Sequence, residues 1–137
     1  MNDIQYFEPD RSFKTPPLSV AARVGDLLFV SGTPGYYPDG HIDEGDFDKQ
    51  FDQAVAVLRH ILERGGASMR SLVKVNMLLT RAQDVAAMNQ RYAQAFGPAP
   101  YPARTTCIVL ALPDPRMLLE IECVAAVLPT GAAATED

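Results

Sequence analysis

The chain has 137 residues, 47% of them hydrophobic, which is enough for one soluble domain with its own core. Its net charge of -5 and its scattered Lys and Arg residues argue against a nucleic-acid surface, because phosphate binding needs clustered positive charge. No apolar run approaches a membrane span and the first residues form no basic or apolar leader, so we expect no membrane partner and a cytoplasmic location.

The first third of the chain predicts an arm, a hairpin and a loop. Pro16 and Pro17 interrupt regular structure, and Gly25-Asp26 is a hairpin-type turn between two short apolar segments. The run that follows is dense in Pro, Gly and Asp. We therefore expect an irregular arm over 1–17, a hairpin over 18–32 and a loop over 33–45.

Two amphipathic helices follow. The first is capped by Asp46, repeats apolar residues at spacings of three and four, and stops at Gly65-Gly66. The second begins at Thr80 or Asp84 and ends before the next Gly-Pro pair.

Two polar side chains border the apolar stripes of these helices. His60 lies near the end of the first and is interpreted as a capping or packing residue. Asn89 lies on the second, where a buried amide must be hydrogen-bonded. It is either a structural clamp on a loop or a group directed into a pocket.

The remaining elements are predicted to be strands at 72–80, 103–112 and 117–125. Along the last strand, aliphatic residues alternate with Glu120 and Glu122, so the carboxylates lie on the face opposite the core. The turn Pro113-Asp114-Pro115 is expected to bring Arg104 back beside this strand. Two alternatives stay open: an ordinary salt bridge, or a cleft in which the guanidinium holds an anion and a carboxylate polarises a water.

The two cysteines, Cys107 and Cys123, both fall in apolar strand-like runs. Neither has a CxxC partner or a histidine at metal-ligand spacing, so they are predicted to be buried thiols in a reducing compartment. Because no glycine-rich phosphate loop, nucleophile motif or metal cluster is present in the sequence, we expect neither a cofactor nor a metal.

The order ββαβαββ predicts an α+β two-layer sandwich, with a mixed sheet and two helices on one face. It forms a single domain over 1–137, with its core at 18–127 and a disordered tail from about 129. The other sheet face is half polar and half aliphatic, so we expect self-association, with Arg104 in clefts between chains.

Six short motifs in this order resemble the RidA (YjgF) family of enamine/imine deaminases over about residues 18–127. The most specific are the Pro-Ala-Arg and Glu-Ile-Glu motifs near the C-terminus. The motifs are 25–32 (GDLLFVSG), 62–68 (LERGGAS), 72–75 (LVKV), 88–93 (MNQRYA), 102–104 (PAR) and 120–122 (EIE).

The resemblance implies a chorismate-mutase-like fold, a homotrimer with sites between subunits, and cofactor-free hydrolysis of reactive enamines such as 2-aminoacrylate to keto acid and ammonia. By position, Arg104 corresponds to the arginine that binds the carboxylate of a small-molecule substrate. Glu120 corresponds to the carboxylate that positions or activates water. Ser31, Gly32 and Asn89 correspond to residues that line the same pocket.

Two positions depart from the family pattern. Leu18 stands where the family has a tyrosine, and Thr106 stands where a cysteine is often found. The changes assign the chain to a divergent subgroup with an altered pocket, for larger unsaturated 2-amino acids such as aminomuconate. Whether Arg116, Tyr36 or Tyr37 supplies the missing contact stays open.

Two other functions remain as alternatives. One is a regulatory module that binds a small carboxylate without turnover, which the loss of the tyrosine at Leu18 favours. The other is a ribonuclease or translation inhibitor, an activity ascribed to some members of the family, against which the acidic composition weighs.

Overall fold

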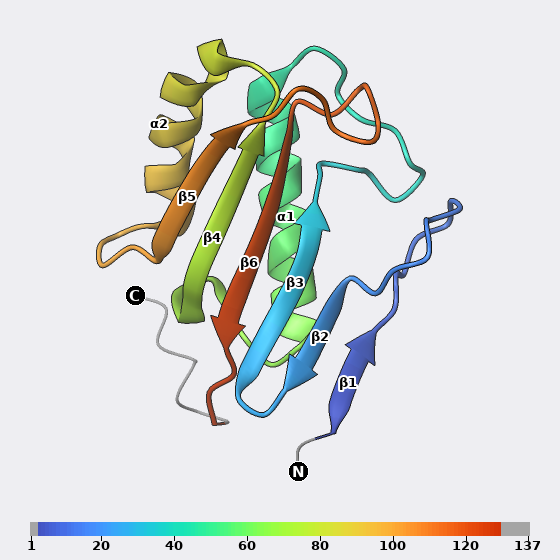
Figure 1. The fold of residues 1–137 in the computed structure, drawn as a ribbon, viewed down its shortest axis with the longest axis vertical. Coiled ribbons are helices and arrows are strands. Elements are labelled where there is room, and N and C mark those ends of the chain that lie inside the picture. Colours follow the sequence, from blue (N-terminus) through green and yellow to red (C-terminus); the bar gives the residue numbers. More distant parts are fainter. Residues whose placement is uncertain (1–2, 130–137) are drawn as a thin grey trace.

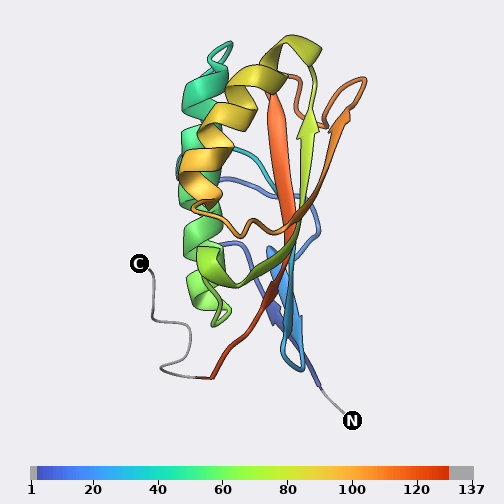
Figure 2. The same cartoon turned by 90° about the vertical axis from the view of Figure 1, so that its left-hand side faces the viewer.

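The computed structural model describes residues 3–129 as two layers, a six-stranded sheet with both helices on one face (Figures 1 and 2). The predicted two-layer α+β sandwich is confirmed. The long elements are β1 (Ile4–Phe7), β2 (Ala21–Val24), β3 (Leu27–Thr33), α1 (Phe47–Arg64), β4 (Leu72–Leu79), α2 (Val85–Phe96), β5 (Ala103–Ile108) and β6 (Leu119–Ala126). Two short 3-10 helices, Met69–Ser71 and Ala82–Asp84, precede β4 and α2.

The strand order across the sheet is β1-β2-β3-β6-β4-β5. Only β4 and β5 run parallel, and every other neighbouring pair is antiparallel, so the sheet is mixed as predicted. The prediction that the turn at 113–115 folds β5 directly onto β6 is wrong, because β4 lies between them. A parallel pair requires a crossover connection, and α2 supplies it.

The N-terminal arm was predicted to be irregular, but it contains a strand. Residues Ile4–Phe7 pair with Ala21–Val24 and extend the sheet by one edge strand. The backbone groups of β2 that face away from β3 thereby gain partners, which a mixed stretch of charged and aromatic residues does not reveal from its composition. The predicted disordered tail lies, beyond Pro129, outside the described residues.

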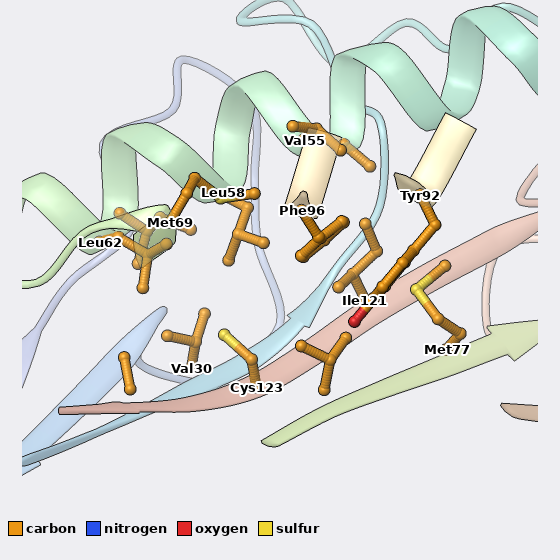
Figure 3. Close-up of a cluster of buried hydrophobic side chains, with 14 of the residues drawn as sticks. Val30, Val55, Leu58, Leu62, Met69, Met77, Tyr92, Phe96, Ile121 and Cys123 are labelled. Atoms are coloured by element: carbon orange, nitrogen blue, oxygen red, sulfur yellow. The ribbon is translucent and has the colours of Figure 1, made fainter. Parts of the chain in front are cut away.

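The core fills the space between the helices and the sheet (Figure 3). Every second residue of β6 is buried, which confirms the alternation that separates Glu120 and Glu122 from the core. Helix α1 begins where the Asp46 side chain accepts a hydrogen bond from the Lys49 amide at 3.1 Å. It ends at Gly65, and Gly66 follows with φ +82°, a value that favours glycine.

Helix α2 begins later than Thr80, at Val85. Asp84 lies at its N-cap position, but its carboxylate binds Arg81 at 2.8 Å and makes no side-chain cap.

Two predictions about single side chains, those of His60 and Cys107, need correction. His60 is exposed and its ring bonds Asp10 at 3.0 Å, so it neither caps nor packs. Cys107 is exposed, because it lies on the uncovered face of β5, whereas Cys123 is buried as predicted.

Candidate functional site

A cavity of about 290 Å³ lies where the arm, the end of β3 and the start of β6 meet. It brings together four of the residues singled out from the sequence, Leu18, Ser31, Gly32 and Glu120. The same wall contains residues that sequence reasoning did not assign to it. These are Arg11, Pro16, Val20, Thr33, Pro34, Ile61, Pro113, Asp114 and Met117. Tyr36, one of the candidates for the missing tyrosine contact, also lines the wall.

The wall at Ser31 and Gly32 owes its shape to an irregularity in β3. The pairing of β3 with β6 shifts register between Val30 and Thr33, and such bulges redirect side chains. The Ser31 hydroxyl donates to the carbonyl of Ser19 at 2.6 Å, which ties the strand to the segment that carries Leu18.

Glu120 is the carboxylate of this cavity whose pKa is raised rather than lowered. Burial, and then the nearby charge of Glu122, raise its pKa above the usual value for a glutamate. Gly32 makes room for it, since a Cβ at that position would lie 2.8 Å from Glu120 Oε2. Glu122 is held separately, by a 2.8 Å hydrogen bond from the Asn76 amide. A carboxylate with a raised pKa is a stronger base than an ordinary glutamate, which suits it to take a proton from water.

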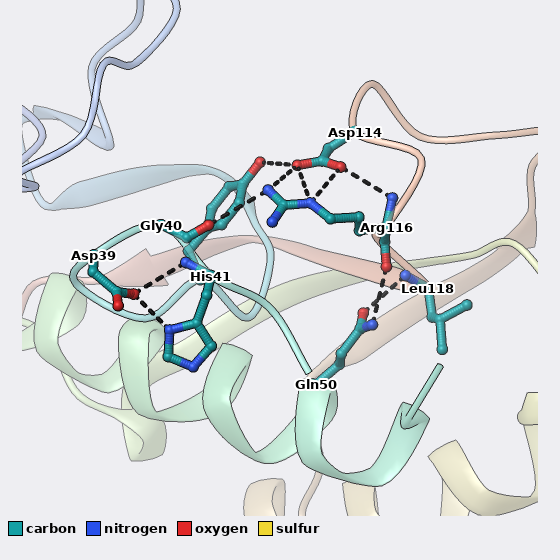
Figure 4. A network of polar contacts seen from close by, with 8 residues as sticks. Asp39, Gly40, His41, Gln50, Asp114, Arg116 and Leu118 are labelled. Atoms are coloured by element: carbon teal, nitrogen blue, oxygen red, sulfur yellow. Dashed lines mark hydrogen bonds and ion pairs between the residues drawn. The ribbon is translucent and has the colours of Figure 1, made fainter. Parts of the chain in front are cut away.

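A polar network fixes the loop that closes the cavity (Figure 4). The Tyr36 hydroxyl donates to Asp114 at 2.8 Å, and Arg116 binds the same carboxylate at 2.7 Å. The Arg116 guanidinium holds the pKa of Asp114 well below its usual range. Buried Gln50 accepts from the Leu118 amide at 2.9 Å and donates to the Arg116 carbonyl at 3.0 Å.

The hydrogen bonds of this network show which of Arg116, Tyr36 and Tyr37 can replace the pocket tyrosine that is absent at Leu18. Of the three candidates, Tyr36 alone is part of the cavity wall. Arg116 is paired with Asp114, and the Tyr37 hydroxyl donates to Asp43 at 2.7 Å. The Tyr36 hydroxyl already donates to Asp114, so toward the cavity it can act only as an acceptor.

Arg104 and Asn89 lie together in a different place, a hollow of about 350 Å³ between α2 and β5. The guanidinium donates to Asn89 Oδ1 at 2.8 Å, and its carbon lies 4.6 Å from the centre of the Tyr92 ring. Among residues 3–129 no carboxylate forms an ion pair with Arg104. The hollow is thus lined by a cation that no described carboxylate neutralises and that three residues of α2, Met88, Asn89 and Tyr92, already orient.

Within one chain, Arg104 and Glu120 are on opposite faces of the sheet. Arg104 is in register with buried Val75, on the face that carries the helices. Glu120 is in register with Leu78, on the other face. The salt bridge between Arg104 and a carboxylate of β6, weighed from the sequence, is therefore absent from the described residues.

Thr106 is in register with Met77, on the helix side, and lines neither the cavity nor the hollow.

Arg11 is the cationic residue of the cavity that sequence reasoning missed. It lies in the arm, where no periodic pattern distinguishes one charged side chain from the next. A weak signal was present, since aromatic Phe13 lies two residues away and stacking on rings is common for arginine.

The comparisons with known proteins agree with this architecture. Residues 12–127 match the family model described as endoribonuclease L-PSP. A RutC family protein of Pyrococcus abyssi is 37% identical over 110 residues, covering 80% of this chain and 85% of that protein. Reactive Intermediate Deaminase A, chloroplastic, of Arabidopsis thaliana is also 37% identical over 110 residues, covering 80% of this chain but 58% of the relative. The crystal structure of the Rid-family protein YyfA from Yersinia pestis aligns with a TM-score of 0.84 and 30% identity, over 91% of this chain and 100% of that one.

Two further observations concern location and metals. No helix within residues 3–129 is both long and apolar enough to cross a bilayer. The same residues contain no group of three or more His, Cys, Asp or Glu side chains arranged to hold a metal ion. The cytoplasmic location stays a prediction, since one of the similar proteins is named as chloroplastic.

Proposed function

The chain belongs to the RidA (YjgF) family, whose model is described as endoribonuclease L-PSP, and on that premise we propose that it hydrolyses reactive enamines and imines of 2-amino acids. The products are a 2-keto acid and ammonia, and no cofactor takes part. The observation that carries the proposal is the half-buried Glu120, whose pKa is raised, in a cavity with Ser31 and Gly32.

The complete site forms between copies of the chain, in a homotrimer. Arg104 and Asn89 of one copy meet the cavity that holds Glu120 of the next. The support is twofold: these groups point away from one another within a chain, and the helix-free sheet face exposes large apolar side chains such as Phe29 and Val73. Burial of that face against a neighbour would remove it from water.

The reaction begins when Arg104 binds the substrate carboxylate through paired N–H donors. A proton from solvent adds to C3 of the enamine, which yields an iminium ion, while Glu120 is present as a carboxylate. The carboxylate then takes a proton from water as the water oxygen bonds to C2. Glu120 returns this proton to the nitrogen, and it takes the hydroxyl proton as the C–N bond breaks and the carbonyl forms. Glu120 then passes this proton to the ammonia, which leaves as ammonium, so one water is consumed and Glu120 ends ionised as it began.

The substrates are 2-aminoacrylate or larger unsaturated 2-amino acids such as aminomuconate. Leu18 replaces a phenol with an aliphatic side chain on the cavity wall, which favours longer carbon skeletons. The same loss of a polar group favours, as a second candidate, a module that binds small carboxylates without turnover. Ribonuclease activity is disfavoured, because the net charge is -5 and several arginines, including Arg81, Arg91 and Arg116, are paired with carboxylates.

The test is keto-acid and ammonia release from imines generated in situ by an amino-acid oxidase or a pyridoxal-phosphate lyase. Wild type is compared with Arg104→Ala and Glu120→Gln, with mass measured by light scattering and folding by circular dichroism. We expect acceleration by wild type and a loss of at least about 100-fold in each variant. A folded wild-type assembly that accelerates no imine would remove the deaminase and leave the binding module.

A further inference from the structure

Arg11 is a half-buried cation that forms no ion pair with any carboxylate of the part of the chain that the structure describes. Its guanidinium carbon lies 5.5 Å from the centre of the Phe13 ring and 5.7 Å from that of Tyr36. No side-chain hydrogen bond or ion pair joins it to a carboxylate within residues 3–129, and it lines the cavity that contains Glu120.

Removing the Arg11 guanidinium from water without pairing it with an anion costs free energy. Burial lowers the pKa of Arg11, the direction expected when a guanidinium loses water. Two aromatic rings compensate for part of that loss through cation–π contacts, but they use none of its N–H donors. An anion with two oxygens would satisfy those donors and restore the balance of charge.

The arm that carries Arg11 is fixed in place. The Ser12 hydroxyl donates to the carbonyl of Pro38 at 2.7 Å, and the Phe13 and Tyr36 rings pack with centroids 5.1 Å apart. The nearest carboxylate in sequence, Asp10, is engaged by His60 at 3.0 Å and by Arg64 at 4.0 Å. Arg11 is thus held at the cavity while the acid beside it in sequence is directed to α1.

We propose that Arg11 binds a second carboxylate of the substrate, at the end remote from the imine, and so selects 2-imino acids with a distal negative charge. This inference rests on the proposed function. Arg104 of the neighbouring copy holds the carboxylate next to the imine, and Arg11 holds the other. Leu18 and the Tyr36 ring, which line the same cavity, border the carbon chain between them.

The test compares two imines of equal length that differ in one charge, generated in situ by oxidation of glutamate and of glutamine. Wild type, Arg11→Gln and Arg11→Lys are assayed, and Lys14→Gln serves as the matched control, because Lys14 is an exposed cation of the same arm outside the cavity lining. We expect wild type to favour the glutamate imine. Arg11→Gln should lower kcat/KM for that imine by about tenfold or more and change the glutamine imine less than about twofold. Arg11→Lys should recover part of the loss.

Equal losses on both imines would overturn the proposal and make Arg11 a structural residue, as would no loss on either. If wild type turns over neither imine, calorimetric binding of 2-oxoglutarate and of its neutral 5-amide decides the question. A preference for 2-oxoglutarate that disappears in Arg11→Gln would support the second carboxylate site even though the deaminase had failed. Equal binding, or no binding of either, would overturn it.

Discussion

Asn89 accepts a 2.8 Å hydrogen bond from Arg104, and this contact joins α2 to the edge strand β5. The amide holds one terminal nitrogen of the guanidinium, and the other donates to the Met88 sulfur at 3.7 Å. We expect Asn89→Ala to raise KM for imines by about tenfold with a smaller change in kcat, because the arginine loses orientation but keeps its charge. Steady-state kinetics check this, with exposed Gln90→Ala as the control. An unchanged KM would show that Met88 and Tyr92 suffice to orient Arg104.

Gly32 tests the position of the Glu120 carboxylate. In Gly32→Ala the new Cβ would lie 2.8 Å from Oε2, so the side chain of Glu120 must move. Because a flexible carboxylate yields rather than the backbone, we expect turnover to fall about 100-fold and Tm to change by less than about 3 °C. The double variant Gly32→Ala, Glu120→Asp, with a shorter acid, should recover part of the rate. Wild-type activity in the single variant would argue against a fixed Glu120.

Glu122 is expected to set the acid limb of the pH–rate profile. Its charge is the second cause, after burial, of the raised pKa of Glu120. Activity that needs ionised Glu120 falls as the pH drops through this raised pKa. Glu122→Gln removes the charge and keeps an acceptor for Asn76, so the acid limb should move to lower pH. Profiles of kcat/KM for both proteins check the direction, and a shift to higher pH would contradict it.

Gln50 is expected to matter for stability. It is 1% exposed, and its side chain serves the Leu118 amide and two carbonyls, those of Asp43 and Arg116. Gln50→Leu keeps the volume but leaves buried groups without partners, at a cost of about 2–3 kcal/mol of unfolding free energy. Urea denaturation measures the difference. Exposed Gln90→Leu is the control and should change stability by less than about 0.5 kcal/mol.

The sequence predicted those parts of the fold that depend on local pattern. The period of α1, its Asp46 cap and the alternation along β6 follow from spacing alone, and the structure confirms all three. Strand pairing is not local. Nothing near Arg104 reveals that β5 pairs with β4, and that single pairing places Arg104 on the opposite face from Glu120.

The candidate site, like the fold, was predictable from the sequence only where short local motifs reveal its residues. Ser31, Gly32 and Glu120 were found through family motifs, and they do line one cavity. Arg11 was missed because its role depends on an arm whose contacts, such as Ser12 with Pro38, connect residues far apart in the chain.

The two cysteine thiols differ in their access to solvent, so the rates at which a reagent modifies them report two different motions. Cys107 is exposed on the helix-free face of β5, whereas Cys123 is buried and its pKa is raised to about 12 by that burial. If copies of the chain associate through that face, as proposed, a thiol reagent should modify Cys107 at the rate at which a neighbouring copy uncovers it. It should reach Cys123 only at the rate at which the sheet separates from the helices. One labelling experiment therefore times dissociation and unfolding separately.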